Sequence, residues 1–188
     1  MAPRPLKAVL TVAAAAAFSL TAVPAQAAPT DPDPAAWAQL TTTYTATGKY
    51  GYAPLAVADG FKPTPCVPGM GYHYVNPANV GQTDPAKPAA LLYVDGPHGR
   101  KLVAVEWVVQ AKDGVARPTM FGEDFQGPDT LPDPLGPSYT LHAWIYKTNP
   151  SGLFNPTNPD VTCGPAAPTS TPPQPEWLAD IDWTDLVT

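Results

Sequence analysis

Two of the three histidines in this chain lie inside short aromatic segments, and one acid lies inside an apolar segment. His73 stands between two tyrosines, His142 stands two positions before Trp144, and Glu106 interrupts the apolar run 103–109. A buried carboxylate costs several kcal/mol unless another group pairs with it. Two imidazoles and one carboxylate on neighbouring strands would provide that pairing, and they also suit zinc, copper or iron. We therefore predict a divalent-metal or polar site formed by His73, Glu106 and His142.

The alternation of residue types places Glu106 and His142 in the middle of two predicted strands, residues 101–110 and 138–147. His73 is predicted to lie in a short strand or at a strand edge, because glycines and a proline bracket its segment. The first strand is predicted to carry Val103, Val105, Trp107 and Val109 on one face, and Leu102, Ala104, Glu106, Val108 and Gln110 on the other. The second is predicted to carry Thr140, His142, Trp144 and Tyr146 on one face, and Leu141, Ala143 and Ile145 on the other.

Simpler interpretations of these residues stay open. A histidine in an aromatic strand is more often a packed, hydrogen-bonded side chain than a metal ligand, and Glu106 could instead bind a backbone group, Arg100 or Tyr146. His98 lies in a turn rich in glycine and proline and is predicted to be a solvated loop residue. No nucleophile elbow, zinc-protease motif, phosphate loop or dinucleotide fingerprint occurs, so the sequence assigns no reaction and no catalytic residue.

The N-terminal residues 1–27 are predicted to be a secretory signal peptide. Arg4 and Lys7 precede an alanine-rich apolar run, and Ala25-Gln26-Ala27 is a small-x-small cleavage site. We therefore expect a secreted, extracellular protein that acts on an unknown extracellular ligand. Because acids outnumber Lys and Arg by 16 to 10, nucleic acids and anionic membranes are poor candidate partners.

The two cysteines, Cys66 and Cys163, are predicted to form one disulfide. Disulfides persist in exported proteins, and a single pair in such a chain most simply bonds to itself, with two free thiols as the alternative.

Proline is abundant but unevenly spread, which divides the chain into parts. Residues 28–163 are predicted to be a single globular domain, 164–175 a Pro/Thr-rich linker, and 176–188 an acidic-aromatic tail. The tail would either pack on its own domain or bind a partner. The predicted fold class is α+β, with one or two N-terminal helices followed by a small, mainly antiparallel sheet and one disulfide.

Capping residues, residue alternation and loop composition predict where the helices, strands and loops of this domain lie. A first helix is predicted after Asp33-Pro34, with Trp37, Leu40, Thr41 and Tyr44 on one face, and a second over residues 54–59. A further strand is predicted over residues 91–94. Residues 111–137 are predicted to be a long loop, either a lid or disordered.

Three segments of the chain resemble a known group of proteins. They are residues 69–77 with Met70-Gly71-Tyr72-His73, residues 102–107 with Glu106, and residues 141–154 with Leu141-His142-Ala143-Trp144 and Asn149-Pro150-Ser151-Gly152-Leu153-Phe154. This pattern resembles an uncharacterised family of small secreted bacterial proteins, over roughly residues 45–163. The resemblance implies one secreted domain that contains His73, Glu106 and His142, and it implies no activity.

Three classes of function follow from these expectations. The first is a metal-binding protein, and if it is an enzyme, two histidines and one carboxylate suit iron(II), copper or zinc chemistry. The second is a non-catalytic extracellular binding module with an aromatic surface for a sugar or peptide. The third is a structural cell-envelope protein. The aromatic surface of the second class would consist of Tyr72, Tyr74, Trp107, Trp144 and Tyr146.

Overall fold

The computed structural model describes residues 34–164. The predicted signal peptide 1–27 and tail 176–188 lie outside the described residues, as does the predicted linker apart from Gly164. The described part begins with helices and continues as a mainly antiparallel sheet, so the predicted fold class is confirmed. Within the described part, no helix combines the length and the apolar composition needed to cross a membrane.

The two predicted helices are present, and a short 3-10 helix joins them. Helix α1 spans Pro34–Thr47, η1 spans Gly48–Gly51 and α2 spans Ala53–Ala58. Helix α2 ends because Gly60 adopts a φ of 93°, which lets the Phe61 amide bond the carbonyl of Ala56 and the Gly60 amide bond that of Val57. This paired C-terminal cap directs the chain into the sheet.

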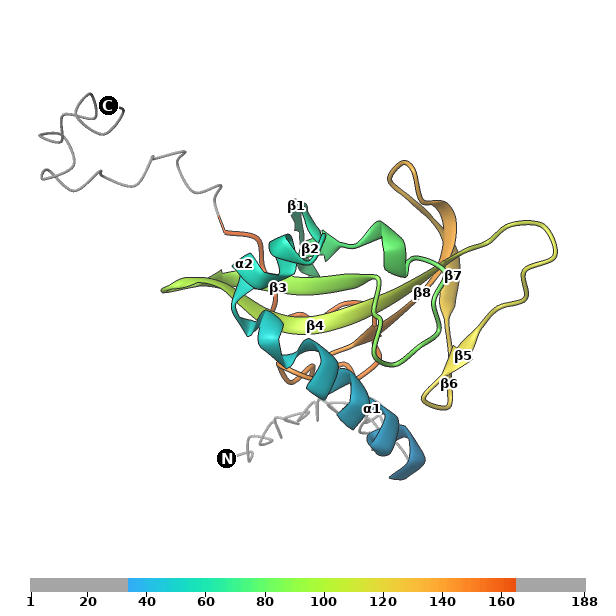
Figure 1. Cartoon of the computed structure of the whole chain (residues 1–188), viewed down its shortest axis with the longest axis horizontal. Coiled ribbons are helices and arrows are strands. Elements are labelled where there is room, and N and C mark those ends of the chain that lie inside the picture. Colours follow the sequence, from blue (N-terminus) through green and yellow to red (C-terminus); the bar gives the residue numbers. More distant parts are fainter. Residues whose placement is uncertain (1–33, 165–188) are drawn as a thin grey trace, which may run out of the picture.

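Six strands form one antiparallel sheet in the order β1-β2-β3-β4-β8-β7, which curls strongly across its width (Figure 1). A short 3-10 helix, η2 (Pro77–Asn79), follows the second strand. The predicted strands 91–94 and 101–110 correspond to β3 and β4. The predicted strand 138–147 corresponds to β8 only as far as Ala143, and the prediction is wrong for residues 144–147. The strands span Lys62–Val67 (β1), Gly71–Val75 (β2), Ala90–Gly96 (β3), Gly99–Gln110 (β4), Gln126–Leu131 (β7) and Gly136–Ala143 (β8).

Glycine is required where β2 begins. Gly71 has a φ of 89°, and a Cβ atom there would lie 2.3 Å from the carbonyl oxygen of Tyr93 in β3. Any side chain would therefore push β2 away from β3. Gly71 thus lets the strand that carries His73 pair closely with the rest of the sheet.

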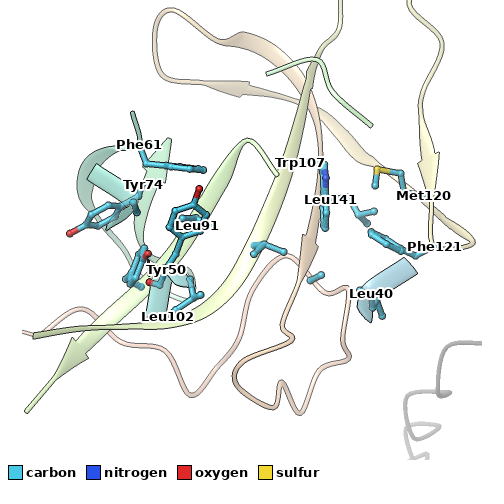
Figure 2. Close-up of a cluster of buried hydrophobic side chains, with 14 of the residues drawn as sticks. Leu40, Tyr50, Phe61, Tyr74, Leu91, Leu102, Trp107, Met120, Phe121 and Leu141 are labelled. Atoms are coloured by element: carbon cyan, nitrogen blue, oxygen red, sulfur yellow. Dashed lines mark hydrogen bonds between the residues drawn. The ribbon is translucent and has the colours of Figure 1, made fainter. Parts of the chain in front are cut away.

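Helix α1 covers one face of the sheet, but it does so with a different set of residues than predicted. Its buried residues are Ala36, Leu40, Thr43 and Thr47. Ala36 and Leu40 join the larger apolar cluster, which includes Trp107, Phe121 and Leu141 (Figure 2). Of the predicted face only Leu40 is buried, because the small residues let the helix lie close to the sheet while the bulky aromatics point away. Trp37, Thr41 and Tyr44 are exposed.

A β-bulge changes the predicted faces of β4 at its start. Leu92 pairs with Ala104 but Tyr93 pairs with Leu102, so Val103 is an extra residue without a partner opposite it. As a result Leu102 joins the α1-side cluster with Trp107, while Val103 joins Ala104 in a second cluster on the other face. The predicted alternation is right from Ala104 onward and wrong for the two residues before it.

The prediction of a lid or disordered loop over residues 111–137 is wrong. This region contains β7 and a small hairpin of β5 (Thr119–Met120) and β6 (Glu123–Asp124), visible at the right of Figure 1. Phe121 and Gly122 form the two-residue hairpin turn, both with positive φ. Phe121 tolerates this conformation because its ring is buried in edge contact with Trp107, at 5.0 Å between ring centroids.

Residues 144–163, here named the closing segment, follow β8 and are ordered by repeated Asn-Pro pairs. Asn149, Asn155 and Asn158 each precede a proline, and each side-chain oxygen accepts a hydrogen bond from the amide two residues further on, at 3.0–3.1 Å. The side chain thereby imitates a backbone turn, and proline fixes the next φ angle. The prolines of these three pairs therefore help to order the closing segment.

The closing segment ends beside the turn between β1 and β2. The amide of Asn158 bonds the carbonyl of Gly69 at 2.8 Å, and the amide of Gly69 bonds the carbonyl of Val161 at 2.9 Å. Next to these bonds, Cys66 and Cys163 form a disulfide with a Cα–Cα distance of 5.8 Å. The predicted disulfide is confirmed, and it joins the first strand to the end of the closing segment.

We expect removal of this disulfide to lower stability, since it closes a loop across a sequence separation of 97. Loop entropy sets an upper figure of about 4–5 kcal/mol for such a crosslink. Thermal unfolding of the Cys66→Ser/Cys163→Ser double variant should therefore show a melting temperature several degrees below that of the wild type. Reductant should lower the melting temperature of the wild type and leave that of the double variant unchanged. Equal melting temperatures for the two oxidised proteins would contradict this expectation.

Candidate metal centre

The structure places the three predicted ligands on three strands and on one face of the sheet. His73 is the middle residue of β2, and Glu106 and His142 lie in β4 and β8. Glu106 and His142 are directly opposite each other in the β4–β8 register, so their side chains leave the sheet on the same side. This is the side of the second apolar cluster, which contains Ala104 and Trp144, two positions from Glu106 and His142 respectively.

His73 reaches Glu106 across an intervening strand. Strand β3 lies between β2 and β4, and strands two apart in a sheet are separated by about 9–10 Å. The β3 residue opposite Glu106 is Ala90, which is fully buried and offers only a methyl group. His73 itself is opposite Leu92, so its ring approaches Glu106 diagonally, past the small side chain of Ala90.

The side chains converge closely. His73 Nε2 lies 3.6 Å from Glu106 Oε2, and His142 Nε2 lies 3.6 Å from Glu106 Oε1. The two imidazole rings are nearly perpendicular, with 6.4 Å between their centroids. One donor atom from each residue lies within 4.8 Å of the other two, which is near enough to bind a metal ion.

All three side chains are largely removed from solvent. The exposed fractions are 13% for the side chain of His73, 7% for that of Glu106 and 2% for that of His142. Both ring nitrogens of His142 are buried without a hydrogen-bond partner. Separations of 3.6 Å to Glu106 are also too long for direct hydrogen bonds. The contacts within the cluster therefore leave both ring nitrogens of His142 unsatisfied.

Burial shifts the protonation of the site toward neutral groups. It raises the pKa of Glu106 to about 8 and lowers the pKa of His73 to about 4. Burial, with the nearby charge of His73 as a second cause, lowers the pKa of His142 to about 3. Without a cation near neutral pH, Glu106 thus holds a proton and both imidazoles are uncharged, which is the ligand form of histidine.

The alternative partners considered for Glu106 are engaged elsewhere. Arg100 forms an ion pair with Asp95 and lies over the ring of Tyr72, with its guanidinium carbon 3.3 Å from the ring centroid. The Tyr146 hydroxyl lies 2.8 Å from the Thr47 hydroxyl of α1. His98 is exposed in the β3–β4 turn, as predicted, and takes no part in the site.

The predicted aromatic binding surface is not present as such. Trp107 and Trp144 are 0% and 3% exposed, and Tyr74 is buried in the core. Tyr146 is half-buried against α1, where it stacks on Tyr44. These rings therefore pack mainly against the protein itself, as does Tyr72, which is half-buried under the guanidinium of Arg100.

Sequence reasoning missed Gln126, whose side-chain oxygen is buried without a hydrogen-bond partner. Gln126 lies in β7 opposite Thr140, so it shares a face with His142, two positions further along β8. Its side-chain nitrogen donates to the carbonyl of Phe154 in the closing segment, at 3.0 Å. No sequence signal indicated this residue, because β7 falls in the region predicted as a loop.

Comparisons of the chain with family models, curated proteins and solved structures found no match. The resemblance to a family of small secreted bacterial proteins accordingly stays a prediction.

The shifted pKa values predict an unusual pH profile for the metal-free protein. His73 and His142 have folded pKa values below the unfolded value of 6.5, so their contribution to stability is lost as pH falls below 6.5. Glu106 has a folded pKa of about 8 against an unfolded value of 4.5, so its contribution is lost as pH rises toward 8. As pH falls below 6.5, the stability lost through the two histidines exceeds the stability gained through the one acid. The free energy of unfolding should therefore be greatest near pH 6.5.

Urea unfolding in the presence of a chelator would measure this profile. Between pH 6.5 and 8 the free energy of unfolding should fall by on the order of 2 kcal/mol, since the folded state holds one proton that the unfolded state has already released. The Glu106→Gln variant should lack this fall, while groups elsewhere titrate alike in both proteins. Parallel profiles for wild type and variant would show that Glu106 does not hold the proton.

Proposed function

We propose that this protein binds one divalent transition-metal ion through His73, Glu106 and His142. The main evidence is the convergence of three donor atoms, one from each residue, within 4.8 Å on one face of the sheet. Two imidazole nitrogens and one carboxylate oxygen are ligands for zinc, copper and iron(II). The three residues also stand on strands held by continuous backbone pairing, which fixes their positions without the ion.

The spacing of the donors supports an ion over a simple polar cluster. A tetrahedral ion with ligands about 2.0–2.1 Å away holds neighbouring ligand atoms about 3.3 Å apart. The two distances of 3.6 Å, each to a different oxygen of Glu106, are slightly longer than that value and longer than those of a hydrogen-bonded cluster. With one donor atom per residue the set extends to 4.8 Å, so the ligands would move closer together on binding an ion. A bound cation would also satisfy a ring nitrogen of His142 and compensate the charge of an ionised Glu106.

Three protein ligands leave at least one coordination position for water or another small ligand. An ion held in this way would act as a Lewis acid on the ligand that occupies the open position. The residues of the chain would hold the ion in a mostly dry setting, with His73 as the most exposed of the three. We infer an ion site of the open kind and assign no reaction to it.

Metal analysis of the purified protein tests the proposal, followed by calorimetric titration of chelator-treated protein with zinc, copper(II) and, without oxygen, iron(II). The wild type should bind one equivalent of at least one of these ions. Glu106→Gln keeps the shape of the side chain but removes its charge, so affinity should fall by at least about 100-fold with little effect on folding.

The matched control is His98→Ala, which removes the one exposed histidine of the β3–β4 turn. It should bind the ion as tightly as the wild type does. Wild-type protein that binds none of the three ions, or an unchanged affinity in Glu106→Gln, would reject the proposal.

A further inference from the structure

A hollow of about 250 Å³ lies between helix α1 and the start of the closing segment. Its walls are mostly apolar, which distinguishes it from the metal centre. We name it the α1 groove. Its main lining residues are Trp37, Leu40 and Tyr44 from the helix and Trp144, Ile145 and Leu153 from the closing segment.

The α1 groove leaves large apolar side chains in solvent. Trp37 is 47% exposed and Tyr44 is 55% exposed, although both belong to a helix that packs on the core. Helix α1 also has no charged residue along its whole length. An exposed apolar patch without charges is typical of a surface that another segment or molecule covers.

The walls of the groove are held in place before anything binds. Tyr44 stacks on Tyr146 at 5.0 Å between ring centroids, and the Tyr146 hydroxyl donates to the Tyr44 carbonyl at 3.2 Å. The indole N–H of Trp144 donates to the Asn155 carbonyl at 2.7 Å, which fixes the position of this side chain. Binding would therefore require little ordering of the groove itself, which favours affinity.

We propose that residues 176–188 of the same chain dock in the α1 groove. This segment combines six large apolar residues with four acids. Its two tryptophans would pack against the aromatic side chains that line the α1 groove. Because α1 carries no acid, the negative charges of the segment meet no repulsion from the helix. The apolar residues are Trp177, Leu178, Ile181, Trp183, Leu186 and Val187.

Residues 165–175 connect the described domain to the proposed docking segment 176–188. From Gly164, the eleven residues 165–175 can span about 34 Å when extended in the manner of proline-rich chain. A compact domain of the size of residues 34–164 has a diameter of about 36 Å. The linker is therefore about as long as the domain is wide, which allows residues 176–188 to fold back onto a large part of the surface of their own domain. Such a tether gives an effective concentration in the millimolar range, so even weak docking would be well populated.

Site-specific photo-crosslinking in the full exported chain tests this docking. A benzophenone amino acid in place of Trp37 would stand at the mouth of the groove, and the same group in place of Tyr52, 66% exposed and outside the groove lining, is the matched control. At low micromolar protein we expect crosslinks within single chains that join position 37 to residues 176–188. The control position should give at least several-fold fewer such crosslinks.

A second variant separates docking from chance proximity. Trp177→Ser/Trp183→Ser in the position-37 protein should reduce the crosslink several-fold, because it removes the two large aromatic side chains that the proposal places in the groove. Crosslinks that join two chains would instead identify a second copy as the occupant and overturn the proposal. An equal yield at positions 37 and 52, or no product that contains residues 176–188, would overturn it as well. The proposal is independent of metal binding.

Discussion

The burial of one carboxylate in the middle of the sheet is the constraint that the rest of this structure must satisfy. Glu106 is 5% exposed in β4, a central strand whose neighbours β3 and β8 pair with it on both sides. Water cannot solvate a charge there, and the surrounding cluster is apolar. The protein can keep the acid neutral, as its raised pKa indicates, or balance its charge with a cation. The two uncharged imidazoles beside it make the second solution chemically available.

Features that are far apart in the sequence combine to present these ligands. The β4–β8 register sets His142 directly opposite Glu106, and Ala90 in β3 leaves the gap that His73 crosses. Gly71 lets β2 approach β3, so that the strand carrying His73 is paired in the first place. The closing segment and its disulfide join the β8 side of the sheet to the β1–β2 turn. Each of these contacts is structural, and together they determine the geometry of the site.

The sequence predicted the parts of this arrangement that depend on local pattern and composition. The helices, strands β3, β4 and β8, and the Cys66–Cys163 bond follow from capping, alternation and a single cysteine pair. The lone acid in an apolar strand was sufficient to suggest the candidate site.

The features that the sequence did not predict depend on tertiary packing. The bulge at Val103 appears only in the pairing register, and β7 has the composition of a loop because it is an edge strand. The buried face of α1 consists of alanine, threonine and one leucine, which periodicity does not distinguish from an exposed face.

The central claim is that His73, Glu106 and His142 hold a single ion, and anomalous X-ray diffraction tests it most directly. Crystals of the protein loaded with zinc, measured on both sides of the zinc absorption edge, would locate the ion without reference to any assumed ligands. The account predicts one strong anomalous peak about 2.0–2.2 Å from one nitrogen of each histidine and from a carboxylate oxygen of Glu106. A peak bound elsewhere, for example at the exposed His98, with none between β2, β4 and β8 would contradict it.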